Sequence, residues 1–262
     1  MTRLLSGVAL AAAALGAILF LPFPVLRVIA CLVAALGAHE YLGIVDPDRR
    51  RLEAVPILIL VVLVCWSFSD PGGQGQPVAL GALSLLVLGV AWAGFEVAWR
   101  RFAVARVRAR LLAPLYLGMP LGMLAAIQQE GGRIATLLVI AGIVVSDSAQ
   151  YYSGRRFGRR PLAPTISPKK TIEGAVGGLV VGTIFMVMAG GWVFQGAQPG
   201  ALALLGAMIV VLGICGDLFE SRLKRAAGVK DSSGLIPGHG GILDRIDALL
   251  FAVPAYYLYL VS

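Results

Sequence analysis

Long apolar segments, separated by short polar connections, constrain the fold of this chain more than any other feature. Of its 262 residues, 58% are hydrophobic and only 14% are charged, whereas charged residues make up roughly a quarter of an ordinary soluble domain. A stretch of about 20 apolar residues is long enough to cross the hydrocarbon core of a bilayer as a helix. The chain is therefore predicted to be all-α, a polytopic integral membrane helical bundle.

About nine such segments can be distinguished, which leaves little chain for a separate soluble domain. The predicted spans cover residues 4–21, 23–44, 54–69, 77–98, 109–128, 134–153, 174–195, 200–220 and 243–261. We expect these transmembrane helices to form a single membrane domain over residues 1–262, in which residues 1–130 supply the N-terminal helices.

Basic residues orient the predicted helices. Lys and Arg gather in alternate connections, with three in residues 46–53, five in 99–110, six in 154–171 and four in 221–240. By the positive-inside rule these connections are cytoplasmic, and Arg3 places the N-terminus on the same side. We therefore expect a multi-pass protein of the cell (inner) membrane. Its net charge of +8 reflects this topology and does not indicate nucleic-acid binding.

The first apolar segment has a second interpretation. Arg3, followed by an apolar run rich in Ala and Gly, also resembles a secretory signal peptide. Retention is the favoured interpretation because the run continues almost directly into the second segment. Cleavage would leave the orientation of every later span unchanged.

Several acids lie at the ends of apolar segments, where burying a charge costs free energy. Ionisable groups inside a bilayer usually face a polar cavity and indicate function. Those at the predicted cytoplasmic ends of the spans 134–153, 200–220 and 243–261 are Asp147, Asp217, Glu220, Asp244 and Asp247. Asp217 and Ser221 are four residues apart, so they share one helix face. If the last two spans are neighbours, Asp217 and Asp244 can approach each other and form a cytosol-facing site for a divalent metal.

The type of ligand indicates which metal this would be. Hard carboxylate oxygens without nearby histidine or thiolate suit Mg²⁺ better than zinc, and Mg²⁺ often binds through one or two carboxylates plus substrate phosphates. The alternative, which stays open above all for Glu220 and Asp247, is that these acids only pair with nearby Lys and Arg and fix the helix ends. Glu40 and Glu96 lie near other helix ends without such company and are interpreted as structural acids.

Two polar connections could bind phosphate. Before the last span, Gly234, Gly238, Gly240 and Gly241 would let the backbone approach a ligand, and a helix N-terminus there would favour an anion. His239 could donate to a phosphate or simply sit at the helix entry. The connection 154–171 offers further donors, and its arginines are interpreted as topology determinants or contacts to anionic headgroups.

Three segments resemble a known enzyme family. Residues 221–247, SRLKRAAGVKDSSGLIPGHGGILDRID, are similar to the signature of the phosphatidate cytidylyltransferases, also called CDP-diacylglycerol synthases. SDSAQYYSGRRFGRR, from Ser146, and PTISPKKTIEG, from Pro164, resemble further blocks of that family, whereas the N-terminal half resembles it only in hydropathy. The resemblance implies transfer of the cytidylyl group of CTP to phosphatidate in phospholipid biosynthesis, with Mg²⁺ required. It makes residues 131–262 the catalytic half.

Spacing and resemblance together nominate the site residues. The predicted catalytic residues are Asp217, Asp244, Lys224 and Asp247. The predicted metal ligands are Asp217, Asp244 and Asp147, with room for a second metal ion. The predicted substrate-binding residues are Ser167, Lys169, Lys170, Glu173, Ser221, Arg225, Lys230, His239 and Arg245. Since a phosphatidate oxygen can itself attack the α-phosphorus of CTP, positioning and charge stabilisation carry the predicted catalysis.

Two other functions remain to be distinguished. A CTP-dependent polyprenol or phytol kinase would send the γ-phosphate to the lipid instead of the cytidylyl group. A transporter would show charges at the midplane and paired broken helices, whereas these acids gather at one membrane face. The expected partners are CTP, phosphatidate and membrane lipids, with no nucleic acid. The sequence leaves the acyl-chain preference and the oligomeric state open and allows a homodimer.

Overall fold

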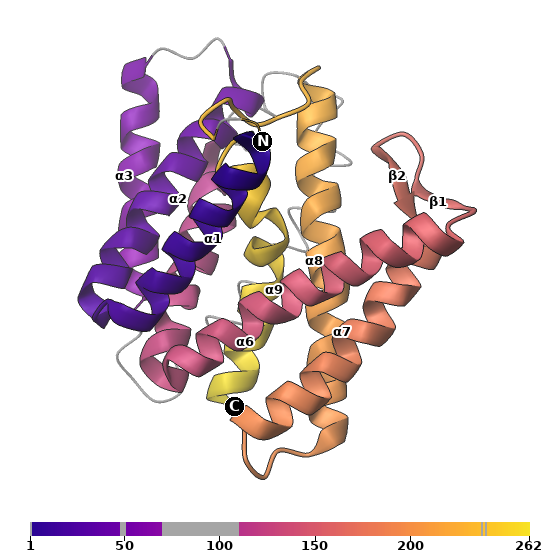
Figure 1. The fold of residues 1–262 in the computed structure, drawn as a ribbon. Coiled ribbons are helices and arrows are strands. Elements are labelled where there is room, and N and C mark those ends of the chain that lie inside the picture. Colours follow the sequence, from indigo (N-terminus) through magenta and orange to yellow (C-terminus); the bar gives the residue numbers. More distant parts are fainter. Residues whose placement is uncertain (1, 48–50, 70–109, 237, 239) are drawn as a thin grey trace.

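The computed structural model describes residues 2–47, 51–69, 110–236, 238 and 240–262, and this part of the chain is mostly helical (Figure 1). The helices are α1 (Thr2–Phe20), α2 (Phe23–Val45), α3 (Arg51–Phe68), the π-helical turn η1 (Pro114–Gly118), α6 (Met119–Phe157), α7 (Ile172–Val193), α8 (Pro199–Ala226) and α9 (Leu243–Val261). Two short strands, β1 (Pro161–Ala163) and β2 (Ser167–Thr171), form an antiparallel hairpin between α6 and α7. The prediction of a helical architecture is confirmed for the described residues, with this hairpin as an addition.

The helices fall on the predicted apolar segments wherever the structure describes them. Four are long and apolar enough to cross a membrane, namely Phe23–Val45, Arg110–Phe157, Ile172–Val193 and Pro199–Ala226, and Gly7–Phe20 and Leu52–Phe68 are shorter apolar helices. The predicted span 77–98, with Glu96, lies outside the described residues. These helices are typical of a membrane protein, while the count of nine spans stays a prediction.

Two predicted spans, 109–128 and 134–153, are joined without a loop. They form two helices that meet at a kink at Gly132, whose backbone is not helical, with φ 78° and ψ −179°. Glycine adopts this conformation readily because it has no Cβ. The bend separates two arms of α6, and the second arm carries Asp147 toward the hairpin.

Small residues let α7 pack closely between α6 and α8. The buried face of α7 includes Gly174, Gly178 and Gly182, which recur every four residues. A Cβ on Gly178 would come closer than 3.0 Å to the side chain of Gln150 on α6, and one on Gly182 would do the same with Val210 on α8. Such small-residue faces allow membrane helices to approach one another. This packing fixes the second arm of α6 relative to α8.

The last two helices also make a close backbone contact. A Cβ on Gly216 of α8 would lie closer than 3.0 Å to the carbonyl oxygen of Asp247 on α9. Beneath this contact, the ring of Tyr116 lies 5.2 Å from that of Phe219 and 6.2 Å from that of Phe251. The prediction that the last two spans are neighbours is confirmed.

Figure 1 also shows which parts of the chain share an end of the bundle. The N-terminus, the C-terminal end of α2 and the connection between α8 and α9 lie at one end. The C-terminus and the connection between α7 and α8 lie at the opposite end. The residues between α8 and α9 are therefore within reach of α2.

Candidate active site

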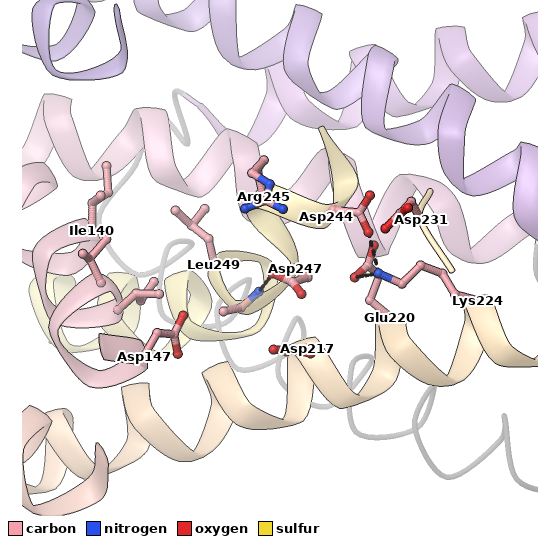
Figure 2. Close-up of a pocket in the computed structure, with 13 residues that line it drawn as sticks. Ile140, Asp147, Asp217, Glu220, Lys224, Asp231, Asp244, Arg245, Asp247 and Leu249 are labelled. Carbon is pink, nitrogen blue, oxygen red and sulfur yellow. Dashed lines mark hydrogen bonds and ion pairs between the residues drawn. The ribbon is translucent and has the colours of Figure 1, made fainter. Parts of the chain in front are cut away.

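A cavity of about 460 Å³ lies among α6, α8 and α9. Its charged lining consists of Asp147, Asp217, Glu220, Lys224, Asp231, Asp244, Arg245 and Asp247, and its apolar lining of Ile140, Ile143, Val144, Ala248 and Leu249. Figure 2 shows Ile140 and Leu249 toward one end, the group around Lys224 and Asp244 at the other, and Asp217 and Asp247 between them. The acids predicted from three separate spans thus line one cavity.

Asp217 is a partly exposed acid of this group. Its side chain is 35% exposed, and its Oδ2 lies 2.5 Å from the ammonium of Lys170 on β2. The hydroxyl of Ser221, one helical turn later, donates to Oδ1 at 3.2 Å, as the spacing of four predicts. The hairpin connection therefore reaches the cavity through Lys170, a predicted substrate-binding residue.

Lys224 joins two buried carboxylates. Its ammonium donates to Glu220 Oε2 at 2.8 Å and also to Asp244 Oδ1. Glu220 is 1% exposed, and its second oxygen, Oε1, accepts no hydrogen bond from any described residue. The Asp247 carboxylate is close enough to repel the charge of Glu220. One ammonium thus serves two carboxylates, and acidic side chains outnumber basic ones in the cavity lining.

Asp244 organises the loop that precedes its own helix. Its Oδ2 accepts from the amide of Ser232 at 2.9 Å, the hydroxyl of Ser232 at 2.8 Å and the amide of Gly241 at 2.8 Å. A Cβ on Gly241 would lie closer than 3.0 Å to the Ser232 hydroxyl. Gly240 has a φ of 80°, which favours glycine. These two glycines let the loop close around Asp244, and their approach to a phosphate stays a prediction.

The other predicted substrate-binding residues divide by position. Arg245 lines the cavity. Glu173 Oε2 accepts from the amides of Arg159 at 3.0 Å and Arg160 at 3.2 Å, so it holds the backbone that enters the hairpin. The guanidinium of Arg225 donates to the carbonyl of Val229 at 3.1 Å, within its own connection.

Three further predicted residues are not tied to the cavity by a described contact. Ser167 and Lys169 lie on β2, where Lys169 is exposed, and Lys230 is exposed in the connection before α9. His239 lies outside the described residues. The roles assigned to all three and to His239 remain predictions.

The donor set of the cavity fits a hard divalent cation. Among the described residues, no three Cys, His, Asp or Glu side chains converge closely enough to hold one ion, so Asp147, Asp217 and Asp244 share a cavity without forming a three-ligand cluster. Asp147 Oδ1 accepts instead from the side-chain amide of Gln150, whose Nε2 lies 2.9 Å away. Mg²⁺ commonly takes one or two carboxylates and completes its shell with phosphates and water. The excess of acids and the unpartnered Glu220 Oε1 fit such an ion.

Comparison with known proteins identifies the family. Residues 1–262 match the model of the cytidylyltransferase family. The chain belongs to this family. Its relatives include the phosphatidate cytidylyltransferases of Pseudomonas aeruginosa, 33% identical over 97% of this chain and 94% of that protein, and of Bacillus subtilis, 34% identical over 98% and 96%. That of Aquifex aeolicus is 43% identical, over 47% of this chain and 45% of that protein. The predicted family resemblance is confirmed.

Sequence reasoning missed one acid of this cytidylyltransferase-family site. Glu40 of α2, interpreted above as a structural acid, accepts from the hydroxyls of Ser232 and Ser233 and from the amides of Ile242 and Leu243. Its signal was present, because it is an ionisable residue inside an apolar span. It was set aside because it is the only acid of the predicted span 23–44.

Proposed function

We propose that the protein transfers the cytidylyl group of CTP to phosphatidate, giving CDP-diacylglycerol and pyrophosphate in phospholipid biosynthesis. Relatives named phosphatidate cytidylyltransferase match nearly the whole chain. The observation that carries the proposal is the cavity lined by α6, α8 and α9. Most of its charged residues gather toward the end with Lys224 and Asp244, while Ile140 and Leu249 lie toward the other end, where Asp147 also lies (Figure 2). A nucleotide and a lipid phosphate need both kinds of surface.

The apolar end suits the lipid substrate. Ile140 and Leu249 line it and offer no group that could hydrogen-bond a phosphate, and Asp147 is the acid that lies toward the same end (Figure 2). We assign the glycerol and the start of the acyl chains to this end, and the phosphates of both substrates to the end with Asp217, Asp244 and the lysines. The rest of the acyl chains would stay in the bilayer beside the bundle.

The charged end suits Mg²⁺, held by Asp217 and Asp244 with Asp147 and Asp247 in support. When bound, the ion would supply positive charge to the phosphates of CTP. Lys170 and Lys224 already contact the two principal acids, so they lie where they can also neutralise phosphate oxygens.

The reaction needs no covalent intermediate on the protein. A phosphatidate oxygen forms a bond to the α-phosphorus of CTP, the bond from that phosphorus to the bridging oxygen of the β-phosphate breaks, and pyrophosphate leaves. The protein contributes alignment of the two phosphates and stabilisation of the developing charge. In this scheme Lys170, Lys224 and Arg245 are the described cations nearest to the reacting groups.

We further propose that the site faces the cytoplasm, with nine spans in the cell (inner) membrane, the N-terminus inside and the C-terminus outside. Support comes from the basic connections and from the positions of the two termini at opposite ends of the bundle (Figure 1). A reporter that is active only outside the cytoplasm, fused after Ser262, should be active. An inactive fusion of a protein that still turns over substrate would overturn this topology.

Isotope transfer tests the reaction itself. Purified protein is incubated with Mg²⁺, phosphatidate and CTP labelled at the α- or the γ-phosphorus. We expect α-label to enter the lipid fraction and γ-label to leave as pyrophosphate, both only when phosphatidate is present. Entry of γ-label into a polyprenol or phytol, without α-label in lipid, would establish the kinase alternative instead.

A further inference from the structure

We propose that Glu40 is a positioning residue of this site: from α2 it holds Ser232 and Ser233 and the start of α9, so that Asp244 faces the cavity. The inference rests on the proposed function and extends the site beyond residues 131–262. It assigns a role to a helix of the N-terminal half, which resembles the family only in hydropathy.

The carboxylate of Glu40 is buried, and both of its oxygens accept hydrogen bonds. The residue is 6% exposed. Its Oε1 accepts from the Ser233 hydroxyl at 2.7 Å and the Ile242 amide at 3.1 Å, and its Oε2 accepts from the Ser232 hydroxyl at 3.0 Å and the Leu243 amide at 2.8 Å. Hydrogen bonds to a charged acceptor are roughly twice as strong as neutral ones. Three donors that serve Glu40 alone, and the Ser232 hydroxyl that it shares with Asp244, tie this segment to α2.

Two of these donors belong to the start of α9. The first amides of a helix have no partner within the helix and need one from elsewhere. The residue at the N-cap of α9, Ile242, makes no side-chain capping bond. Glu40 supplies the missing acceptor from a different helix, about 200 residues away in the chain. The first turn of α9 is therefore placed by α2.

The link from Glu40 to the cavity is short. The Ser232 hydroxyl lies between Glu40 Oε2 and Asp244 Oδ2, at 3.0 Å and 2.8 Å. A hydroxyl has one proton, so it can donate to only one of these carboxylates at a time. Leu243, whose amide Glu40 accepts, is the residue before Asp244. Loss of the Glu40 charge should therefore shift Asp244, and with it Lys224, without removing either side chain.

The test replaces Glu40 by the amide of the same shape. In Glu40→Gln the side-chain nitrogen must face two donors, so about half of the four bonds are lost. The matched control is Glu53→Gln on α3, an acid that is 44% exposed and pairs with Arg110, away from the cavity. Both variants are compared with the full-length parent protein in the same detergent or nanodisc, by steady-state kinetics with CTP and phosphatidate and by hydrogen–deuterium exchange.

A positioning role predicts a specific pattern. Since misplacement by about 1 Å can cost roughly a hundredfold in rate, we expect Glu40→Gln to lower kcat by at least about tenfold with little change in KM for CTP. Exchange should become faster in peptides covering 241–247 and stay unchanged in those covering 250–260. Glu53→Gln should match the parent in both measurements. A parent protein without turnover would refute the proposed function, while the exchange comparison would still test the placement of the loop.

Three results would overturn the inference. The first is a folded Glu40→Gln protein with parental kcat. The second is a lower kcat with unchanged exchange at 241–247, and the third is faster exchange throughout α9, which would mean general destabilisation. If Glu40→Gln does not fold, Ser233→Ala decides, since it removes one donor to Glu40 and leaves the carboxylate in place. We expect a smaller loss of kcat with the same local change in exchange, and parental values in both would contradict the proposal.

Discussion

Asp217 and Asp244 are assigned the same chemical role, but the folded protein depends on them very differently. Asp244 has a side chain that is 7% exposed, contacts Lys224, and accepts three further hydrogen bonds from the loop before α9. Asp217 is 35% exposed and contacts Lys170 and Ser221. Replacement of each by Asn should therefore abolish turnover in both cases and lower stability in only one.

The magnitudes follow from these contacts. In Asp244→Asn the buried Lys224 loses one of its two carboxylates, and breaking a buried pair costs about 3–5 kcal/mol. Glu220 still pairs with Lys224, so we expect the lower end of this range, a loss of about 3 kcal/mol in the free energy of unfolding. This figure includes the weakening of the loop hydrogen bonds, which would be made to a neutral acceptor. The partly exposed pair of Asp217 contributes at most about 1 kcal/mol.

The assay measures the two properties separately. Pyrophosphate release from CTP with Mg²⁺ and phosphatidate reports turnover, and thermal or denaturant unfolding of the same preparations reports stability. We expect no turnover in either variant, a clearly lower unfolding midpoint for Asp244→Asn, and a nearly parental midpoint for Asp217→Asn. Full activity in either variant would refute the metal assignment, and equal destabilisation would refute the reading of the contacts.

Two further changes test the packing around the site, and a third tests the role of Lys170. Gly241→Ala should lower activity and the unfolding midpoint, because the new Cβ would clash with the Ser232 hydroxyl and the Glu40 carboxylate. We expect a loss of about 1–3 kcal/mol in the free energy of unfolding. Gly234→Ala is the control, since a Cβ there would meet nothing within 4 Å. Gly216→Ala should separate α8 from α9 and lower the unfolding midpoint, whereas at Gly213 the nearest atom is 3.7 Å away, so Gly213→Ala should be tolerated. Lys170→Met should reduce kcat/KM for CTP with an unchanged midpoint, since its ion pair is partly exposed; parental kinetics would contradict its placement beside the phosphates.

The arrangement of the site acids was predictable because it depends on local rules. Helical spacing placed Ser221 on the face of Asp217, and the structure confirms their hydrogen bond. A short connection made the last two spans neighbours, and Asp217 and Asp244 line one cavity. Both inferences need only the helical repeat and the reach of the chain.

The contacts to Glu40 and Lys170 were not predictable in this way. Glu40 was interpreted as a structural acid because it lies near a helix end away from the other candidate acids, and nothing along the chain indicates its partners, which lie about 200 residues later. Lys170 was one of several cations nominated for phosphate, and nothing in its spacing indicated Asp217 as its partner. The two helices of α6 meet at Gly132, between the two predicted spans, but hydropathy did not indicate the sharp kink that joins them.

The sequence by itself predicted a helical membrane protein and placed Ser221 on the helix face of Asp217, while the family was indicated by the resemblance of three segments. These properties follow from apolar length, helical period and residue types at fixed spacing, all of which are local along the chain. The tertiary structure alone decided that an acid of α2 holds the start of α9, and that Lys170 and Lys224 contact the two principal carboxylates. Such contacts depend on how distant helices pack, which small residues at their interfaces permit but no spacing along the chain specifies.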